Sequence, residues 1–211
     1  MGSVAVTDRP ALLNRGRRLE YFTVFYNSVE GLVGVAAGLL AGSIALVGFG
    51  FDSAIEVTSG ATLLWRLHQD GDPARRERME RMTLRIVGLC FLALAVYVGY
   101  DSILSLVRKV APERSVVGIG LAVVSLAVMP WLARAKRMVA RAIGSAALSA
   151  DARQTDFCTY LSAVLLGGLL LNAVLGWWWA DPISALIMVP IIAREGVLAL
   201  RGKTCCSDCG H

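Results

Sequence analysis

The chain has 211 residues, of which 56% are hydrophobic and only 18% are charged. A soluble domain of this size needs far less apolar surface to build a core, so the composition excludes that class and indicates an integral membrane protein. The formal net charge of +5 follows from basic residues gathered on one side of the membrane, as described below, so it does not indicate a nucleic-acid partner.

The first twenty residues are basic and contain no apolar run of the length that a signal peptide needs. We therefore expect residues 1–20 to form a cytoplasmic tail. Between Glu20 and Arg66 the only ionisable side chains are Glu30, Asp52 and Glu56. At about 1.5 Å per residue this stretch is too long for one crossing and long enough for two. A hairpin at 41–43 is expected to join them.

Four further apolar stretches follow in chain order. They predict spans from Ile86 to Val107, from Ser115 to Ala133, from about Ala152 to Ala180 and from Pro182 to about Leu200. The predicted fold is therefore an all-α membrane protein with six transmembrane helices. Residues 21–201 are expected to form the membrane domain and residues 202–211 a Cys/His-rich tail.

The basic residues predict the orientation of these spans. With this count, all 21 Lys and Arg residues except Arg108, Lys109 and Arg114 fall on one face of the membrane. The positive-inside rule makes that face cytoplasmic, so both termini are expected in the cytoplasm. Trp177, Trp178 and Trp179 then lie at the outer interface, where amphipathic rings prefer to sit.

Asp52 and Glu56 are one helical turn apart inside the second predicted span. An ionisable side chain in hydrocarbon costs a few kcal/mol. Two carboxylates kept on one helix face are most simply explained by a hydrophilic ligand, and a cation is the natural one.

The fifth predicted span offers a second pair, Gln154 and Cys158, which are four residues apart and share a face, while Asp156 points roughly opposite. A thiolate facing two carboxylates suits a borderline or soft divalent cation such as zinc or cadmium. The alternative is that Cys158 is only a small buried apolar residue. Cys158 lies farther from the outer end of its helix than Asp52 does, so a shared site requires the fifth helix to tilt or to protrude outward.

Glu30 is predicted at the same depth as Asp52, roughly 15–18 Å below the outer surface at 1.5 Å per residue. It is a candidate extra ligand or proton carrier. The alternative is a protonated carboxyl group that is hydrogen-bonded to a neighbouring helix.

The last seven residues hold three of the five cysteines and one of the two histidines. Cys205, Cys206, Cys209 and His211 have the ligand types of a soft-metal site. On the cytoplasmic side these thiols are expected to stay reduced. The alternative is a terminus whose thiols bind metal only adventitiously.

Three runs of the sequence resemble parts of a known family of membrane proteins. The run AGSIALVGFGFDSAIEV resembles the second helix of the cation diffusion facilitator superfamily, with Asp52 and Glu56 at its two metal-binding positions. The stretch ADARQTDFCTYLSAVLL resembles the family's fifth helix, where Gln154 and Cys158 stand in place of the usual His or Asp and Asp. GWWWADPISALIM resembles the turn between the fifth and sixth helices. Members commonly continue into a cytoplasmic metallochaperone-like domain, and this chain is expected to be a short member without it.

The resemblance implies a homodimeric secondary transporter that exports a divalent transition metal by proton antiport, and we expect it in the bacterial inner (plasma) membrane. Zinc and cadmium come first because a thiolate joins carboxylates, while cobalt, nickel, iron and manganese remain open. The transporter's partners would be membrane lipid, metal ions and protons, with no nucleic acid and no organic cofactor. No P-loop or dinucleotide fingerprint is present, and we do not expect an enzyme. Two alternatives are a membrane metal sensor or scaffold that binds metal through its tail without transport, and a thiol redox enzyme that works through the tail cysteines.

Overall fold

The computed structural model describes residues 9–68 and 73–201. Within these ranges the chain forms six helices and no strand: α1 (Arg9–Ala41), α2 (Ile44–His68), α3 (Pro73–Arg108), α4 (Val116–Ile143), α5 (Ala146–Leu175) and α6 (Ala180–Leu200). Each helix is long and apolar enough to cross a membrane. The predicted all-α architecture with six spans is therefore confirmed.

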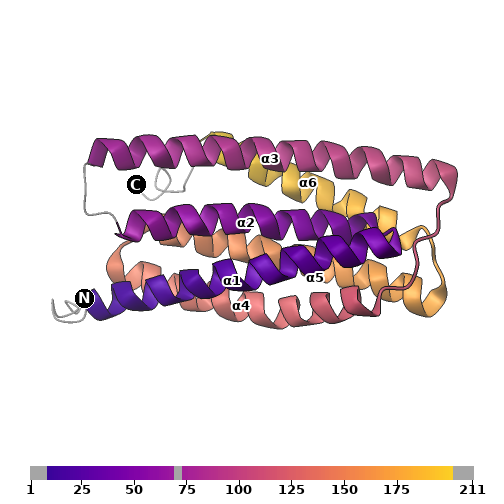
Figure 1. Cartoon of the computed structure of the whole chain (residues 1–211), viewed down its shortest axis with the longest axis horizontal. Coiled ribbons are helices and arrows are strands. Elements are labelled where there is room, and N and C mark those ends of the chain that lie inside the picture. Colours follow the sequence, from indigo (N-terminus) through magenta and orange to yellow (C-terminus); the bar gives the residue numbers. More distant parts are fainter. Residues whose placement is uncertain (1–8, 69–72, 202–211) are drawn as a thin grey trace, which may run out of the picture.

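The helices run side by side along the long axis of the molecule, and α1 begins at the same end at which α6 ends (Figure 1). Most packing joins α1 to α2, α4 to α5, and α1 to α4, whereas α3 packs chiefly on α6. At the crossing of α3 and α6 the backbones approach closely, because a Cβ atom added to Gly88 would lie 2.8 Å from the carbonyl oxygen of Gly196. The molecule is thus a group of four helices with a pair of helices at its side.

Several helices extend beyond the apolar stretches that predicted them. α1 begins at Arg9 inside the predicted tail, α3 begins at Pro73, and α4 continues to Ile143. The predicted fifth span was too long at its outer end: α5 ends at Leu175, Gly176 adopts a left-handed conformation with φ 67°, and Ala180 already belongs to α6. Backbone hydrogen bonds carry a helix past the membrane surface, so helix ends follow caps and turns and not the limits of hydrophobicity.

The predicted hairpin between the first two helices is present. Gly42 has φ 64° in this turn, a conformation that costs glycine little. Just inside the turn, a Cβ atom on Gly38 would lie 2.7 Å from Val47, and one on Gly34 would lie 3.2 Å from Gly50. These small residues allow α1 and α2 to pack closely, and this contact fixes the depth of Asp52 relative to α1.

At the same end of the bundle, α6 is tied to the start of α2 by Asp181. Its buried carboxylate accepts hydrogen bonds from the Ser43 hydroxyl at 2.5 Å and from the backbone N–H of Ile44 at 2.9 Å. The first N–H groups of a helix have no partner inside the helix. Asp181 supplies one from another helix and so joins the α3–α6 pair to the remaining bundle.

We expect Asp181→Ala to lower the free energy of unfolding by about 2 kcal/mol, because it removes charge-assisted hydrogen bonds at a helix start. Thermal unfolding of the purified protein measures this. Asp101→Ala is the matched control, since the partly exposed Asp101 accepts no hydrogen bond within residues 9–68 and 73–201. Equal stability of the two variants would contradict a tie between α6 and α2.

Candidate functional site

Asp52 and Glu56 both lie inside the bundle on α2, with exposed fractions of 5% and 4%. The two carboxylates interact electrostatically with each other. Glu56 Oε2 accepts a hydrogen bond of 2.6 Å from Asn27 Nδ2 on α1. Asp52 accepts none from the described part of the chain, and its electrostatic neighbours are Glu30 and Glu195. Asp52 is therefore a buried carboxylate without a fixed donor, which leaves it available to a cation.

Glu30 of α1 is also fully buried, with an exposed fraction of 1%. Its Oε2 accepts a hydrogen bond from the Ser53 hydroxyl at 2.9 Å, and its Oε1 accepts one from the Tyr26 hydroxyl at 3.1 Å. Because Ser53 directly follows Asp52 on α2, Glu30 lies at the depth predicted for it. Hydroxyl donors can hold either a carboxylate or a carboxylic acid, so this geometry suits both a ligand and a proton carrier.

Cys158 of α5 is buried, and its Sγ lies 4.0 Å from Glu30 Oε2. It also lies within electrostatic reach of Glu56 and Asp52. A Cβ atom added to Gly118 on α4 would contact both Leu46 of α2 and Leu169 of α5. Leu169 is thus level with the start of α2, and α5 continues beyond that level for another turn and a half, about 9 Å, to Leu175. This protrusion brings Cys158 to the carboxylates.

Gln154 faces α2, and its Oε1 accepts a hydrogen bond of 3.1 Å from the Ser59 hydroxyl. Ser59 lies one turn beyond Glu56, so Gln154 is at the edge of the group that is nearer the end of α2. Asp156 points elsewhere, as its position predicted, and forms an ion pair of 2.7 Å with Arg137 of α4. The face of α5 that the sequence singled out therefore does meet α2.

Among the described residues, no three His, Cys, Asp or Glu side chains are gathered as a ready metal site. The candidate residues instead form a loose set that three helices supply: Glu30 from α1, Asp52 and Glu56 from α2, and Cys158 from α5. A cation held by more than two of them would require either small helix movements or an additional kind of ligand.

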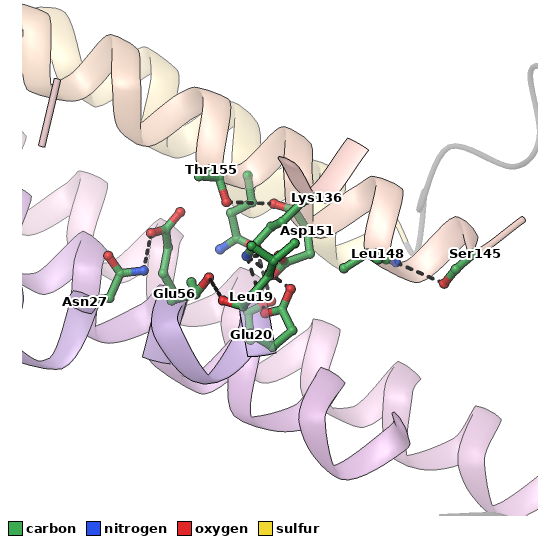
Figure 2. Close-up of polar contacts among 12 residues, drawn as sticks. Leu19, Glu20, Asn27, Glu56, Lys136, Ser145, Leu148, Asp151 and Thr155 are labelled. Atoms are coloured by element: carbon green, nitrogen blue, oxygen red, sulfur yellow. Dashed lines mark hydrogen bonds and ion pairs between the residues drawn. The ribbon is translucent and has the colours of Figure 1, made fainter. Parts of the chain in front are cut away.

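A second buried polar group lies next to this set and was not predicted. Lys136, which was predicted to lie in the connection after the fourth span, is instead a fully buried residue of α4. Its Nζ pairs with Glu20 of α1 at 3.2 Å and with Asp151 of α5. Figure 2 shows this group beside the Asn27–Glu56 hydrogen bond. Lys136 also interacts electrostatically with Glu56, so the two groups are coupled.

The sequence analysis also missed Asn27, because a single asparagine in an apolar helix carries no signal without its neighbours. The predicted tail ligands Cys205, Cys206, Cys209 and His211 lie outside the described residues. Their role stays a prediction.

The fold and this geometry define a class. The chain is an integral membrane protein, and its residues 9–68 and 73–201 form six helices whose interior holds buried carboxylates from two helices beside a thiol from a third. Residues 21–202 match the model of the cation efflux transmembrane domain. The chain belongs to this family of cation transporters.

Two curated relatives are similar at low identity. A protein of Synechocystis sp. named as an uncharacterized transporter is 26% identical over 160 residues, which cover 72% of this chain and 51% of the relative. A protein of Methanocaldococcus jannaschii with the same kind of name is 25% identical over 174 residues, which cover 80% of this chain and 61% of the relative. The matched part thus spans between half and two thirds of these relatives.

Proposed function

We propose that the protein is a secondary transporter that exports a divalent transition-metal cation from the cytoplasm through the site formed by Asp52, Glu56 and Cys158. The observation that carries this proposal is the buried pair on α2 in a chain of the cation efflux family. Charged side chains inside a membrane domain are costly and usually mark an ion pathway. Asp52, which has no hydrogen-bond donor in the described ranges, is the residue that most needs a cation.

Zinc and cadmium are the proposed substrates. A thiolate at Cys158 and carboxylates at Asp52 and Glu56 combine a soft donor with two hard ones, which suits borderline and soft divalent ions. Sulfur favours these ions over manganese or magnesium, which prefer all-oxygen sites. Glu30 is proposed as a further ligand or as the proton carrier, since hydroxyl groups hold both of its oxygens.

The transport cycle is proposed from the family resemblance. The helices would expose the site alternately to the two sides, and protons would replace the metal on the carboxylates. We propose a homodimer in the bacterial plasma membrane, with the start of α1 and the end of α6 on the cytoplasmic side, where the basic residues gather. The Cys/His-rich tail would then raise the local metal concentration at the cytoplasmic mouth.

The decisive experiment is transport into proteoliposomes that contain the purified full chain. Zinc, cadmium, cobalt, nickel and manganese would be offered separately, with and without an imposed pH gradient. We expect saturable zinc and cadmium uptake that responds to the gradient. Metal binding without flux would favour the alternative of a membrane sensor or scaffold, and flux unaffected by the pH gradient would contradict proton antiport.

We expect Cys158→Asp to change the substrate preference. It replaces a soft thiolate by a hard carboxylate at the same position, so the ratio of cadmium to zinc uptake should fall by about tenfold. The ratio of initial rates in proteoliposomes measures this effect. Cys90→Ala is the matched control, since it removes the other thiol of the described residues, which lies exposed on α3. An unchanged ratio in Cys158→Asp would mean that Cys158 only fills space.

A further inference from the structure

Asn27 lies on α1 with an exposed fraction of 0%. Its Nδ2 donates a hydrogen bond of 2.6 Å to Glu56 Oε2, while its Oδ1 is buried and has no hydrogen-bond partner. Figure 2 shows the Asn27 and Glu56 side chains meeting between their helices, beside the group around Lys136. The amide group of Asn27 thus has one atom bonded to Glu56 and one oxygen without a partner.

An ionised Glu56, the form that can hold a cation, only accepts hydrogen bonds, so the NH₂ of Asn27 faces it and Oδ1 is the atom without a partner. Leaving a buried carbonyl oxygen unsatisfied is costly. The nearby hydroxyl groups of α1 are engaged elsewhere, because Thr23 and Ser28 bond to backbone carbonyls of their own helix and Tyr26 bonds to Glu30.

The open oxygen belongs to a side chain that is bonded to a candidate ligand. Asn27 is bonded to Glu56 and is three residues before Glu30, so it shares a face of α1 with that candidate ligand. Within the described ranges no three acidic, thiol or imidazole side chains gather as a metal site. A neutral amide oxygen would add a ligand beside Glu56 without adding negative charge to the buried carboxylates of Asp52, Glu56 and Glu30.

We propose that Asn27 Oδ1 is a direct ligand of the transported cation and that Asn27 Nδ2 holds Glu56 in position beside it. This inference rests on the proposed function and identifies a further residue of that site. Gln154 differs from Asn27, because its Oε1 accepts a bond from Ser59 and its unpartnered atom is the donor Nε2. Amide oxygen is a hard ligand, so Asn27 should moderate the preference for soft ions that Cys158 creates.

The test is calorimetric titration of the purified full chain with zinc, cadmium and manganese ions. Asn27→Leu removes the ligand at similar size, and Asn27→Asp keeps an oxygen at the same place but loses the NH₂ donor. Asn172→Leu is the matched control, because Asn172 is also buried but donates to the carbonyl of Pro112 at the other end of the bundle. We expect Asn27→Leu to weaken binding of every ion by tenfold or more, and Asn172→Leu to bind as the wild type does.

The Asn27→Asp variant distinguishes two roles of Asn27, a direct ligand of the cation and a residue that acts only by positioning Glu56. If Asn27 is a ligand, the Asn27→Asp variant should bind manganese more tightly than the wild type, because a carboxylate replaces the amide oxygen. If Asn27 served only to hold Glu56, Asn27→Asp would bind all three ions as weakly as Asn27→Leu, and the proposal would be overturned. Wild-type affinity in Asn27→Leu would also overturn it. If Asn27→Leu does not fold, the manganese affinity of Asn27→Asp decides alone. A wild-type protein that binds no divalent ion would instead refute the proposed function itself.

Discussion

Asp52→Asn should abolish metal transport and leave the protein folded. The change keeps the size of the side chain and removes its charge, so the site loses the carboxylate that has no hydrogen-bond donor within the described residues. Because an isolated buried charge destabilises a folded protein, removing it should leave thermal stability equal to or above that of the wild type. Loss of transport together with unchanged or raised stability is the result that identifies a ligand. Initial uptake rates in proteoliposomes and thermal unfolding of the same preparation measure both.

The matched control is Asp156→Asn. It makes the same chemical change on α5, at a carboxylate that pairs with Arg137 in a partly exposed position. Surface ion pairs contribute about 0–1 kcal/mol, so transport and stability should both stay near the wild-type values. If folded Asp52→Asn transported metal at the wild-type rate, the site would have to be placed elsewhere in the bundle.

The number of helices was predictable because charges interrupt the apolar stretches of the sequence. The helix ends were not, because local capping decides them. Pro73 suits the first position of a helix, where its missing N–H is not needed, and α3 begins there although the residues that follow are charged. Gly176 ends α5 before the three tryptophans. Hydrophobicity predicts which residues lie in the membrane, whereas capping residues determine where a helix ends.

The candidate site was likewise predictable only in part. The spacing of Asp52 and Glu56 and the equal depth of Glu30 could be predicted, because one helix or one hairpin fixes both. The position of Cys158 depended on how far α5 protrudes, which is set by its packing against α4, α6 and α2. Lys136 and Asn27 could not be interpreted at all, since their roles come from partners on other helices.

Lys136→Met should lower the free energy of unfolding by about 3–5 kcal/mol, the range found when one partner of a buried ion pair is removed. The ammonium group lies between Glu20 and Asp151, and the side chains of Lys136 and Glu20 are fully buried. Methionine has a similar shape, so packing is kept while two carboxylates lose their counter-charge. At about 2–4 °C per kcal/mol for a chain of this length, the melting temperature should fall by roughly 10 °C. Thermal unfolding in detergent measures it.

The triple variant Glu20→Gln, Lys136→Met, Asp151→Asn tests whether charge is the cause. Replacing a complete buried ion group by neutral residues of similar shape is often neutral or stabilising, so the triple variant should recover most of the lost stability. Arg137→Met, which breaks the partly exposed pair with Asp156, should change stability by less than about 1 kcal/mol. If the triple variant were as unstable as Lys136→Met, the lysine would stabilise the bundle through the packing of its aliphatic chain. Recovery would mean that the instability of Lys136→Met comes from the uncompensated carboxylates of Glu20 and Asp151. Because Lys136 also interacts electrostatically with Glu56, its charge would then act on the candidate site as well as on its own ion pairs.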